Sequence, residues 1–205
     1  MTVAERAYYE QRAHEYDDWY LGTGLYAERV RPGWHEEVQQ LLALVSSIRG
    51  SSLLDVACGT GFLTRHLTGR VTGLDQSAAM LSIARERLPA GAFVRGDALR
   101  LPFATHFFEW LVSGHFYGHL REPDRFQFLA EARRVASRVV IIDAAQRENE
   151  QPVQVQERVL NDGSRHKVFK RFFTPEQLAS ELGSGNVLHA GRWFVVVAAE
   201  GARLS

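Results

Sequence analysis

The feature that most constrains the fold is an apolar run that ends in a glycine turn, at residues 53–64. Residues 53–57 are apolar apart from Asp55, which is typical of a strand buried on both faces of a parallel sheet. Gly59 and Gly61 permit a tight turn with positive φ and leave room for a ligand beside the backbone. We expect a helix to begin at once, over 62–67, with its free N–H groups directed at a negative group. A buried strand, a glycine turn and a helix start in this order predict a small-molecule site.

Two familiar glycine motifs fit this turn poorly. A P-loop requires lysine and then Ser or Thr after its second glycine, whereas Phe62 and Leu63 follow Gly61. The dinucleotide fingerprint G-x-G-x-x-G places its third glycine where this chain has Thr64. The P-loop is therefore excluded, and the dinucleotide motif is matched only in part.

Acidic residues also end the next two predicted strands. Strand 71–75 ends in Asp75, which lies 20 residues after Asp55, and strand 93–96 is followed by Asp97. A carboxylate at the tip of the second strand can accept hydrogen bonds from both ribose hydroxyls of a nucleoside. Asp97 could meet the exocyclic amine of an adenine. Three strands that end in carboxylates predict a nucleoside site with no evident demand for phosphate.

The motif D-x-x-x-G-x-G at 55–61, together with Asp75 and Gly96-Asp97, resembles the S-adenosylmethionine site of class I methyltransferases. The resemblance is to the small-molecule group that includes the ubiquinone and menaquinone C-methyltransferases, and it is strongest over residues 50–145. The family usually has Phe-Asp where this chain has Phe108-Glu109, a difference at a strand entrance. The resemblance implies S-adenosylmethionine as the cofactor and S-adenosylhomocysteine as its product.

The resemblance also implies a set of cofactor-binding residues, which lie on the N-terminal segment or close to the ends of predicted strands: Tyr16, Asp55, Gly59, Gly61, Asp75, Gln76, Met80, Asp97, Ala98 and Ser113. Asp55 and the two glycines would surround the methionine part of the cofactor. Asp75 would hold the ribose, and Asp97 and Ala98 would face the adenine. Tyr16 would approach the cofactor's carboxylate.

Alternating strand and helix patterns predict an α/β fold with a doubly wound, mostly parallel, seven-stranded Rossmann-like sheet. The turn at 161–164 predicts an inserted β-hairpin between 153–159 and 165–173. Strands at 186–189 and 193–198 are expected to close the sheet as an antiparallel pair. A chain of 205 residues suits one domain. We divide it into a helical lid and first long helix (1–48), a cofactor-binding core (50–145), the hairpin insertion (146–173) and a closing helix and strands (174–205).

Composition narrows the partners and the compartment. Lys plus Arg and Asp plus Glu both number 24, so no global basic field favours nucleic acid. Cys58 is the only cysteine, which excludes an intramolecular disulfide and favours a reducing compartment. The chain has neither an apolar run that could span a membrane nor a leader-like start, so we expect a cytoplasmic enzyme, monomeric or homodimeric.

Candidate catalytic residues follow the fourth predicted strand, where a doubly wound sheet opens. His115 and His119 are candidate general bases, because an ordinary imidazole is largely neutral at working pH. They are four residues apart, but Gly114 and Gly118 disfavour a helix there and no acid or cysteine completes a ligand set, so we expect no metal.

Aromatic residues at 8–20 predict a helix that either packs on the domain or closes the cofactor pocket as a lid. They suggest a flat or lipophilic acceptor, and basic residues of the hairpin suggest an anionic group on it. The expected substrate-binding residues come from these two segments and from the loop after the fourth strand: Tyr8, Trp19, Tyr20, Tyr117 and Arg171.

The predicted function is therefore methyl transfer from S-adenosylmethionine to a small, aromatic or lipophilic acceptor, with oxygen slightly favoured because of the histidines. Three alternatives stay open: a quinone-type C-methyltransferase, a nicotinamide-dependent oxidoreductase on a similar sheet, and a cofactor-binding protein without transferase activity.

Overall fold

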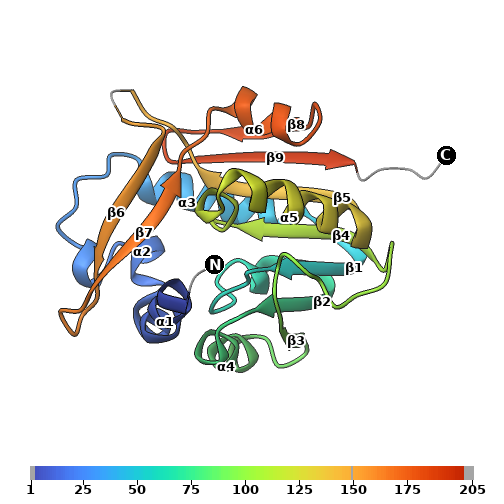
Figure 1. Cartoon of the computed structure of the whole chain (residues 1–205), viewed down its shortest axis with the longest axis horizontal. Helices are drawn as coiled ribbons and strands as arrows, with labels where there is room; N and C mark the ends of the chain where they lie inside the picture. Colours follow the sequence, from blue (N-terminus) through green and yellow to red (C-terminus); the bar gives the residue numbers. More distant parts are fainter. Residues whose placement is uncertain (1–2, 149, 201–205) are drawn as a thin grey trace.

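The computed structural model describes residues 3–148 and 150–200, which fold around one large sheet (Figure 1). The sheet contains seven strands in the order β3-β2-β1-β4-β5-β9-β8. These strands span β1 (Arg49–Val56), β2 (Thr68–Asp75), β3 (Ala92–Arg95), β4 (Phe108–Gly114), β5 (Ala136–Ala144), β8 (Asn186–Ala190) and β9 (Phe194–Glu200). β1 to β5 are parallel, whereas β9 is antiparallel to both β5 and β8. The predicted mostly parallel sheet with an antiparallel end pair is confirmed.

Helices cover both faces of this sheet (Figure 1). These helices are α3 (Trp34–Ser47), α4 (Ala78–Arg87), α5 (Glu122–Val135) and α6 (Pro175–Glu181). Residues of β5 alternate between two apolar cores: Val139 and Ile141 belong to the core under α5 and α6, and Val140 and Ile142 to the core under α3. Burial on both faces explains why the central strands are continuous apolar runs in the sequence.

The N-terminal segment and a hairpin lie together beyond the carboxyl ends of the parallel strands (Figure 1). The segment contains α1 (Val3–Arg12) and α2 (Asp18–Leu21), with short 3-10 turns after each. β6 (Val153–Val159) and β7 (Arg165–Arg171) form the predicted antiparallel hairpin as a separate two-stranded sheet. Tyr8 of α1 packs against Leu160 and Val168 of the hairpin, and this contact joins the N-terminal segment to the hairpin.

The helix predicted at 62–67 is wrong. The glycine turn leads instead into a single 3-10 turn at Thr64–His66, and β2 already begins at Thr68. Within this short span the Thr64 hydroxyl donates back to Asp55 Oδ2 at 2.6 Å. The connection is thus too short for an α-helix of useful length, and the expected helix dipole at this turn does not exist.

Candidate functional site

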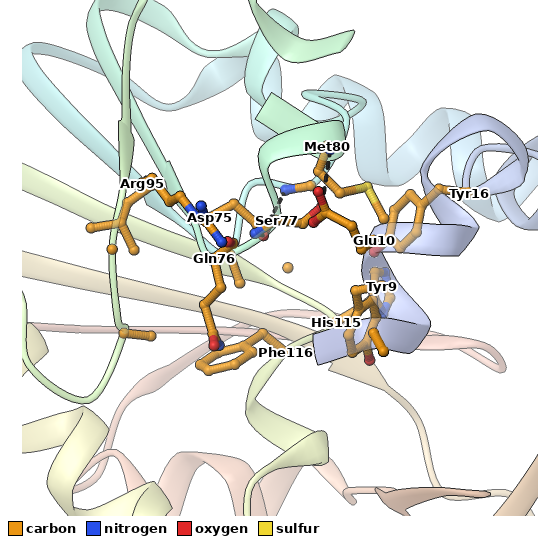
Figure 2. Close-up of a pocket in the computed structure, with 17 residues that line it drawn as sticks. Tyr9, Glu10, Tyr16, Asp75, Gln76, Ser77, Met80, Arg95, His115 and Phe116 are labelled. Carbon is orange, nitrogen blue, oxygen red and sulfur yellow. Dashed lines mark hydrogen bonds between the residues drawn. The ribbon is translucent and has the colours of Figure 1, made fainter. Parts of the chain in front are cut away.

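A cavity of about 430 Å³ lies at the carboxyl ends of β1, β2 and β4. The chain runs outward from β1 to β2 and β3 and then crosses to β4 on the other side of β1, and doubly wound sheets bind ligands at such a reversal of strand order. Figure 2 shows Tyr9 and Tyr16 on one side of the cavity and Gln76 and Arg95 on the other. Its volume is in the range, roughly 300–1,000 Å³, of small-molecule sites. We call it the cofactor cavity.

Asp75 is the acidic centre of the cofactor cavity. Its Oδ2 accepts from the Gly59 backbone N–H at 2.9 Å and its Oδ1 from the Ser77 N–H at 2.9 Å. Burial raises the pKa of Asp75, and these N–H donors oppose that shift by stabilising the carboxylate. A carboxylate fixed in this way retains lone pairs that can accept from neighbouring ribose hydroxyls.

The turn between β1 and the 3-10 segment supplies the backbone wall of the cofactor cavity. Ala57 and Gly59 line it, with φ of 58° and 54°. Positive φ is uncommon for alanine, so Ala57 is a strained position held by the structure around it. Gly61, with φ of 77°, does not line the cavity; a Cβ there would lie 3.3 Å from the Cα of Ala84, so this glycine allows α4 to pack closely.

The predicted cofactor residues divide into two groups. Six line the cavity: Tyr16, Gly59, Asp75, Gln76, Met80 and Ala98. The other four do not line it: Asp55, Gly61, Asp97 and Ser113. The Ser113 hydroxyl donates to the Val56 carbonyl at 2.9 Å, and Asp97 Oδ1 accepts from the Leu99 N–H at 3.0 Å. Burial raises the pKa of Asp55 to about 7, although its bond from Thr64 lowers it.

The N-terminal segment covers the cofactor cavity and is tied to it. Asp17 accepts from the Thr60 hydroxyl at 2.6 Å and forms an ion pair with Arg87 of α4. Glu10 of α1 lines the cavity, and its Oε1 accepts from the Ala79 backbone N–H at 3.1 Å. These contacts place Tyr16 beside the glycine turn, where a Cβ on Gly59 would lie 3.5 Å from its ring.

A second cavity, of about 310 Å³, adjoins the first. Tyr9, Tyr16 and His115 line both cavities and therefore form their common wall. The rest of the second cavity comes from segments far apart in sequence: the N-terminal helices, the loop after β4, the end of β5, the hairpin and Trp193. We call it the acceptor cavity.

His115 occupies a strained position at this common wall. Its φ is 55°, and its imidazole is surrounded by the rings of Trp19, Tyr20 and Phe194, whose centroids lie 4.7, 5.5 and 5.4 Å away. Its Nε2 is buried without a hydrogen-bond partner among the described residues. Burial lowers the pKa of His115 to about 3, so the imidazole stays neutral and can accept a proton or a hydrogen bond.

His119 and the hairpin are held by a buried ion pair. Lys170 of β7 pairs with Asp143 of β5, whose Oδ2 also accepts from the Gly118 N–H at 2.7 Å. Burial alone would raise the pKa of Asp143, but the Lys170 ammonium holds it below its ordinary value. His119 bonds the Phe169 carbonyl through Nδ1 at 2.7 Å, and burial lowers its pKa well below the ordinary value. The pair thus connects the hairpin to the histidine loop.

Of the predicted substrate residues, only Trp19 lines the acceptor cavity. Tyr8 is buried against the hairpin, and Tyr20 stacks on Phe62 with a centroid distance of 4.1 Å. The Tyr117 hydroxyl donates to Glu181 at 2.6 Å, and Arg171 pairs with the same carboxylate at 3.2 Å. These four side chains are used in packing and in ion pairs at the cavity's periphery.

Basic residues of the hairpin were expected near the acceptor, but the N-terminal arginines that line the acceptor cavity were not. Arg12, Arg31 and Arg158 line it, and Lys170 belongs to it as well. The hairpin's alternation gave a signal for Arg158, because Gln154, Gln156 and Arg158 share one face of β6. Arg12 and Arg31 gave none, since isolated arginines in helices and loops are ordinarily exposed.

None of the described helices, from α1 to α6, is long and apolar enough to cross a bilayer. Within the described part of the chain, His, Cys, Asp and Glu side chains form no group of three suited to a metal ion.

Comparison with known proteins identifies relatives of this arrangement. A family model described as a methyltransferase domain matches residues 53–138. The demethylmenaquinone methyltransferase of Thermotoga maritima is 36% identical over 105 residues, which are 49% of this chain and 45% of that protein. The chain therefore spans about half the length of this curated relative.

Two solved structures resemble the whole chain. The complex of DhpI with SAH has a TM-score of 0.75 and 26% identity, covering 98% of this chain and 97% of that one. A complex of DhpI that includes SAM has a TM-score of 0.76 and 25% identity, covering 97% and 98%. None of these findings supports a nicotinamide-dependent oxidoreductase.

The donors and walls of the cofactor cavity fit an adenosyl cofactor: a fixed carboxylate at the tip of β2, a close backbone turn after β1, and apolar walls at Met80 and Ala98. With this sheet order, the chain is similar to class I S-adenosylmethionine-dependent methyltransferases, in sequence over residues 53–138 and in fold over nearly its whole length.

Proposed function

We propose that this protein transfers a methyl group from S-adenosylmethionine in the cofactor cavity to a small molecule in the acceptor cavity. The observation that carries the proposal is the common wall: Tyr9, Tyr16 and His115 line both cavities. A donor and an acceptor bound on the two sides of this wall would be neighbours, and alignment of two bound reactants supplies about 7–11 kcal/mol toward a bimolecular reaction.

Each cavity has a distinct task in this proposal. Asp75 would accept from the ribose hydroxyls, and Met80 and Ala98 would contact apolar parts of the nucleoside. The cofactor supplies a methyl group on a positively charged sulfur, already activated for in-line displacement. Tyr9, Trp19 and Trp34 would offer aromatic surface to a flat acceptor.

We propose oxygen as the methylated atom, with His115 as the proton acceptor. The acceptor oxygen forms its bond to the methyl carbon as the carbon–sulfur bond breaks, and the bond's electron pair stays on sulfur as a neutral thioether. The hydroxyl becomes strongly acidic as the new bond forms, so even the weakly basic imidazole of His115 can take its proton during the transfer and then pass it to water.

Methylation of a quinone ring carbon is the second candidate, because the relative from Thermotoga maritima is a demethylmenaquinone methyltransferase. The polar, arginine-containing lining of the acceptor cavity favours the first candidate. The products distinguish them, since an O-methyl ether or ester and a C-methyl ring have different NMR shifts.

The direct experiment incubates the full chain with methyl-labelled S-adenosylmethionine and a library of small metabolites. The expected result is label in one or a few small products, and S-adenosylhomocysteine in equal amount. Cofactor binding without labelled product from any acceptor would favour the remaining alternative, a binding protein without transferase activity. Failure to bind S-adenosylhomocysteine would overturn the proposal altogether.

A further inference from the structure

The acceptor cavity has a one-sided charge. Its described lining contains no Asp or Glu. It does contain Lys170 and five arginines: Arg12, Arg29, Arg31, Arg147 and Arg158. The cofactor cavity differs, because Glu10 and Asp75 line it with only Arg95 to oppose them. The two cavities therefore suit ligands of opposite charge.

Two of these cations are already neutralised by neighbouring carboxylates. Lys170 pairs with Asp143, and Arg147 with Glu150. Among the described ion pairs, none involves the other four arginines. They make neutral contacts instead: Arg158 donates to Gln156 at 2.5 Å, and Arg31 to the Trp19 carbonyl at 2.9 Å. The positive charge of these four arginines is therefore not compensated by a carboxylate of the described structure.

Arg12 is the most telling of the four, because it is only 8% exposed. It donates a hydrogen bond to the Tyr26 hydroxyl at 3.3 Å, and its guanidinium lies over the rings of Tyr16 and Tyr8, 4.8 and 5.6 Å from their centroids. A guanidinium has five N–H donors, and no carboxylate of the described structure pairs with that of Arg12. A buried charge without a carboxylate partner is costly, and an anionic ligand would offset that cost.

The hairpin is oriented to add to this charge. The polar face of β6, with Gln154, Gln156 and Arg158, is half-buried toward the cavity, whereas Val153 and Val155 are 46% and 63% exposed. Ordinary amphipathic packing would bury the valines. The reversed orientation places Arg158 in the acceptor cavity, opposite the N-terminal arginines.

We infer that the acceptor is a small anion, in which a carboxylate or phosphate group is held by Arg12, Arg31 and Arg158 while the rest of the molecule extends to the common wall. This inference rests on the proposed function, since it names the substrate class of the same site. Guanidinium groups bind both kinds of anion through paired N–H donors, which explains a lining of arginines.

Calorimetry on the full chain tests the inference in two stages. S-adenosylhomocysteine is titrated first, and its failure to bind would count against the proposed function. The saturated protein is then titrated with benzoate, with inorganic phosphate, and with benzamide, which has nearly the shape of benzoate but no charge. We expect saturable binding of benzoate or phosphate, at least about tenfold tighter than that of benzamide. Which anion binds more tightly distinguishes a carboxylate site from a phosphate site.

Matched variants locate the anion. Arg158→Gln and Arg12→Gln should each weaken binding of the preferred anion about tenfold or more, with S-adenosylhomocysteine binding within a few-fold of normal. Arg165→Gln is the control, because Arg165 is 66% exposed, lies on the same hairpin and pairs with Glu157 outside the cavity. Arg158 is half-buried, so its variant retains the test even if Arg12→Gln fails to fold. Binding of benzamide as tight as that of both anions, or equal losses in Arg165→Gln and Arg158→Gln, would overturn the inference.

Discussion

The two cavities of this protein are built in different ways. The cofactor cavity is formed mainly by residues 57–116, a continuous stretch of strands and turns, with a cover from α1 and Tyr16. The acceptor cavity collects side chains from residue 9 to residue 193 and has no local framework of its own. A local site can be recognised in a sequence, whereas a site assembled from distant segments can be recognised only in the fold.

The common wall gives the largest expected effect. His115→Asn removes the imidazole, and Asn tolerates the positive φ at this position. Loss of a general base should lower kcat by about 10²–10⁴-fold. Calorimetry should show S-adenosylhomocysteine affinity within a few-fold of normal, which separates a role in chemistry from a role in cofactor binding. A kcat within threefold of normal would show that His115 does not take the proton.

The buried ion pair offers a way to perturb the acceptor cavity alone. Lys170→Met leaves the Asp143 carboxylate buried without its cation, so the free energy of unfolding should fall by about 3–5 kcal/mol. Arg165→Gln breaks an exposed pair on the same hairpin and should cost about 1 kcal/mol or less. Urea unfolding measures both. Equal losses in the two variants would contradict the role given to the Asp143–Lys170 pair.

Asp75→Ala perturbs the cofactor cavity. It removes a carboxylate that accepts two backbone N–H bonds and is expected to accept from the ribose. The affinity for S-adenosylhomocysteine should fall by about 1–3 kcal/mol, the cost of losing a buried charged partner. Calorimetry measures this, and an unchanged affinity would show that the ribose lies elsewhere.

Acid should weaken the fold through the histidine loop. Burial holds the pKa of His115 in the folded chain at about 3, against an ordinary value of about 6.5. Between these two pH values the unfolded chain therefore binds a proton on this imidazole, whereas the folded chain does not. The stability from this group is present above pH 6.5 and is lost as the pH falls from about 6.5 toward 3. For this single proton the slope reaches at most about 1.4 kcal/mol per pH unit. His115→Asn should flatten the pH dependence measured by urea unfolding.

Asp97→Ala should have the smallest effect and sharpens the account of the cofactor cavity. The side chain of Asp97 bonds the Leu99 N–H and does not line the cavity. The affinity for S-adenosylhomocysteine should change by less than about 0.5 kcal/mol, as expected of a substitution away from the ligand. A loss as large as that of Asp75→Ala would show that the bound cofactor reaches Asp97.

Much of the fold could be predicted because the sheet's strands are apolar runs separated by turn signals. The mostly parallel sheet, its antiparallel end pair and the hairpin all followed from such local patterns. The helix at 62–67 could not be judged from its residues, because β2 begins earlier, at Thr68, than the pattern at 71–75 indicated. The length of a connection depends on where the next strand pairs.

The candidate site was predictable to a similar degree. Asp75 and Gly59 could be found from motif spacing, and the structure places them together. Arg12 and Arg31 could not, because nothing local distinguishes an arginine that enters a cavity from one that faces water. Arg171 was expected at the substrate, and in the structure it pairs with Glu181. Successive side chains of a strand point to opposite faces, and the neighbouring Lys170 is the one that lines the cavity.

The most direct test of the two-cavity account is a crystal structure of the full chain grown with S-adenosylhomocysteine. The account predicts ribose hydroxyls within hydrogen-bond distance of Asp75 and the sulfur directed toward the wall formed by Tyr9, Tyr16 and His115. Density for the nucleoside in the arginine-lined cavity, or at any place away from Asp75, would contradict it.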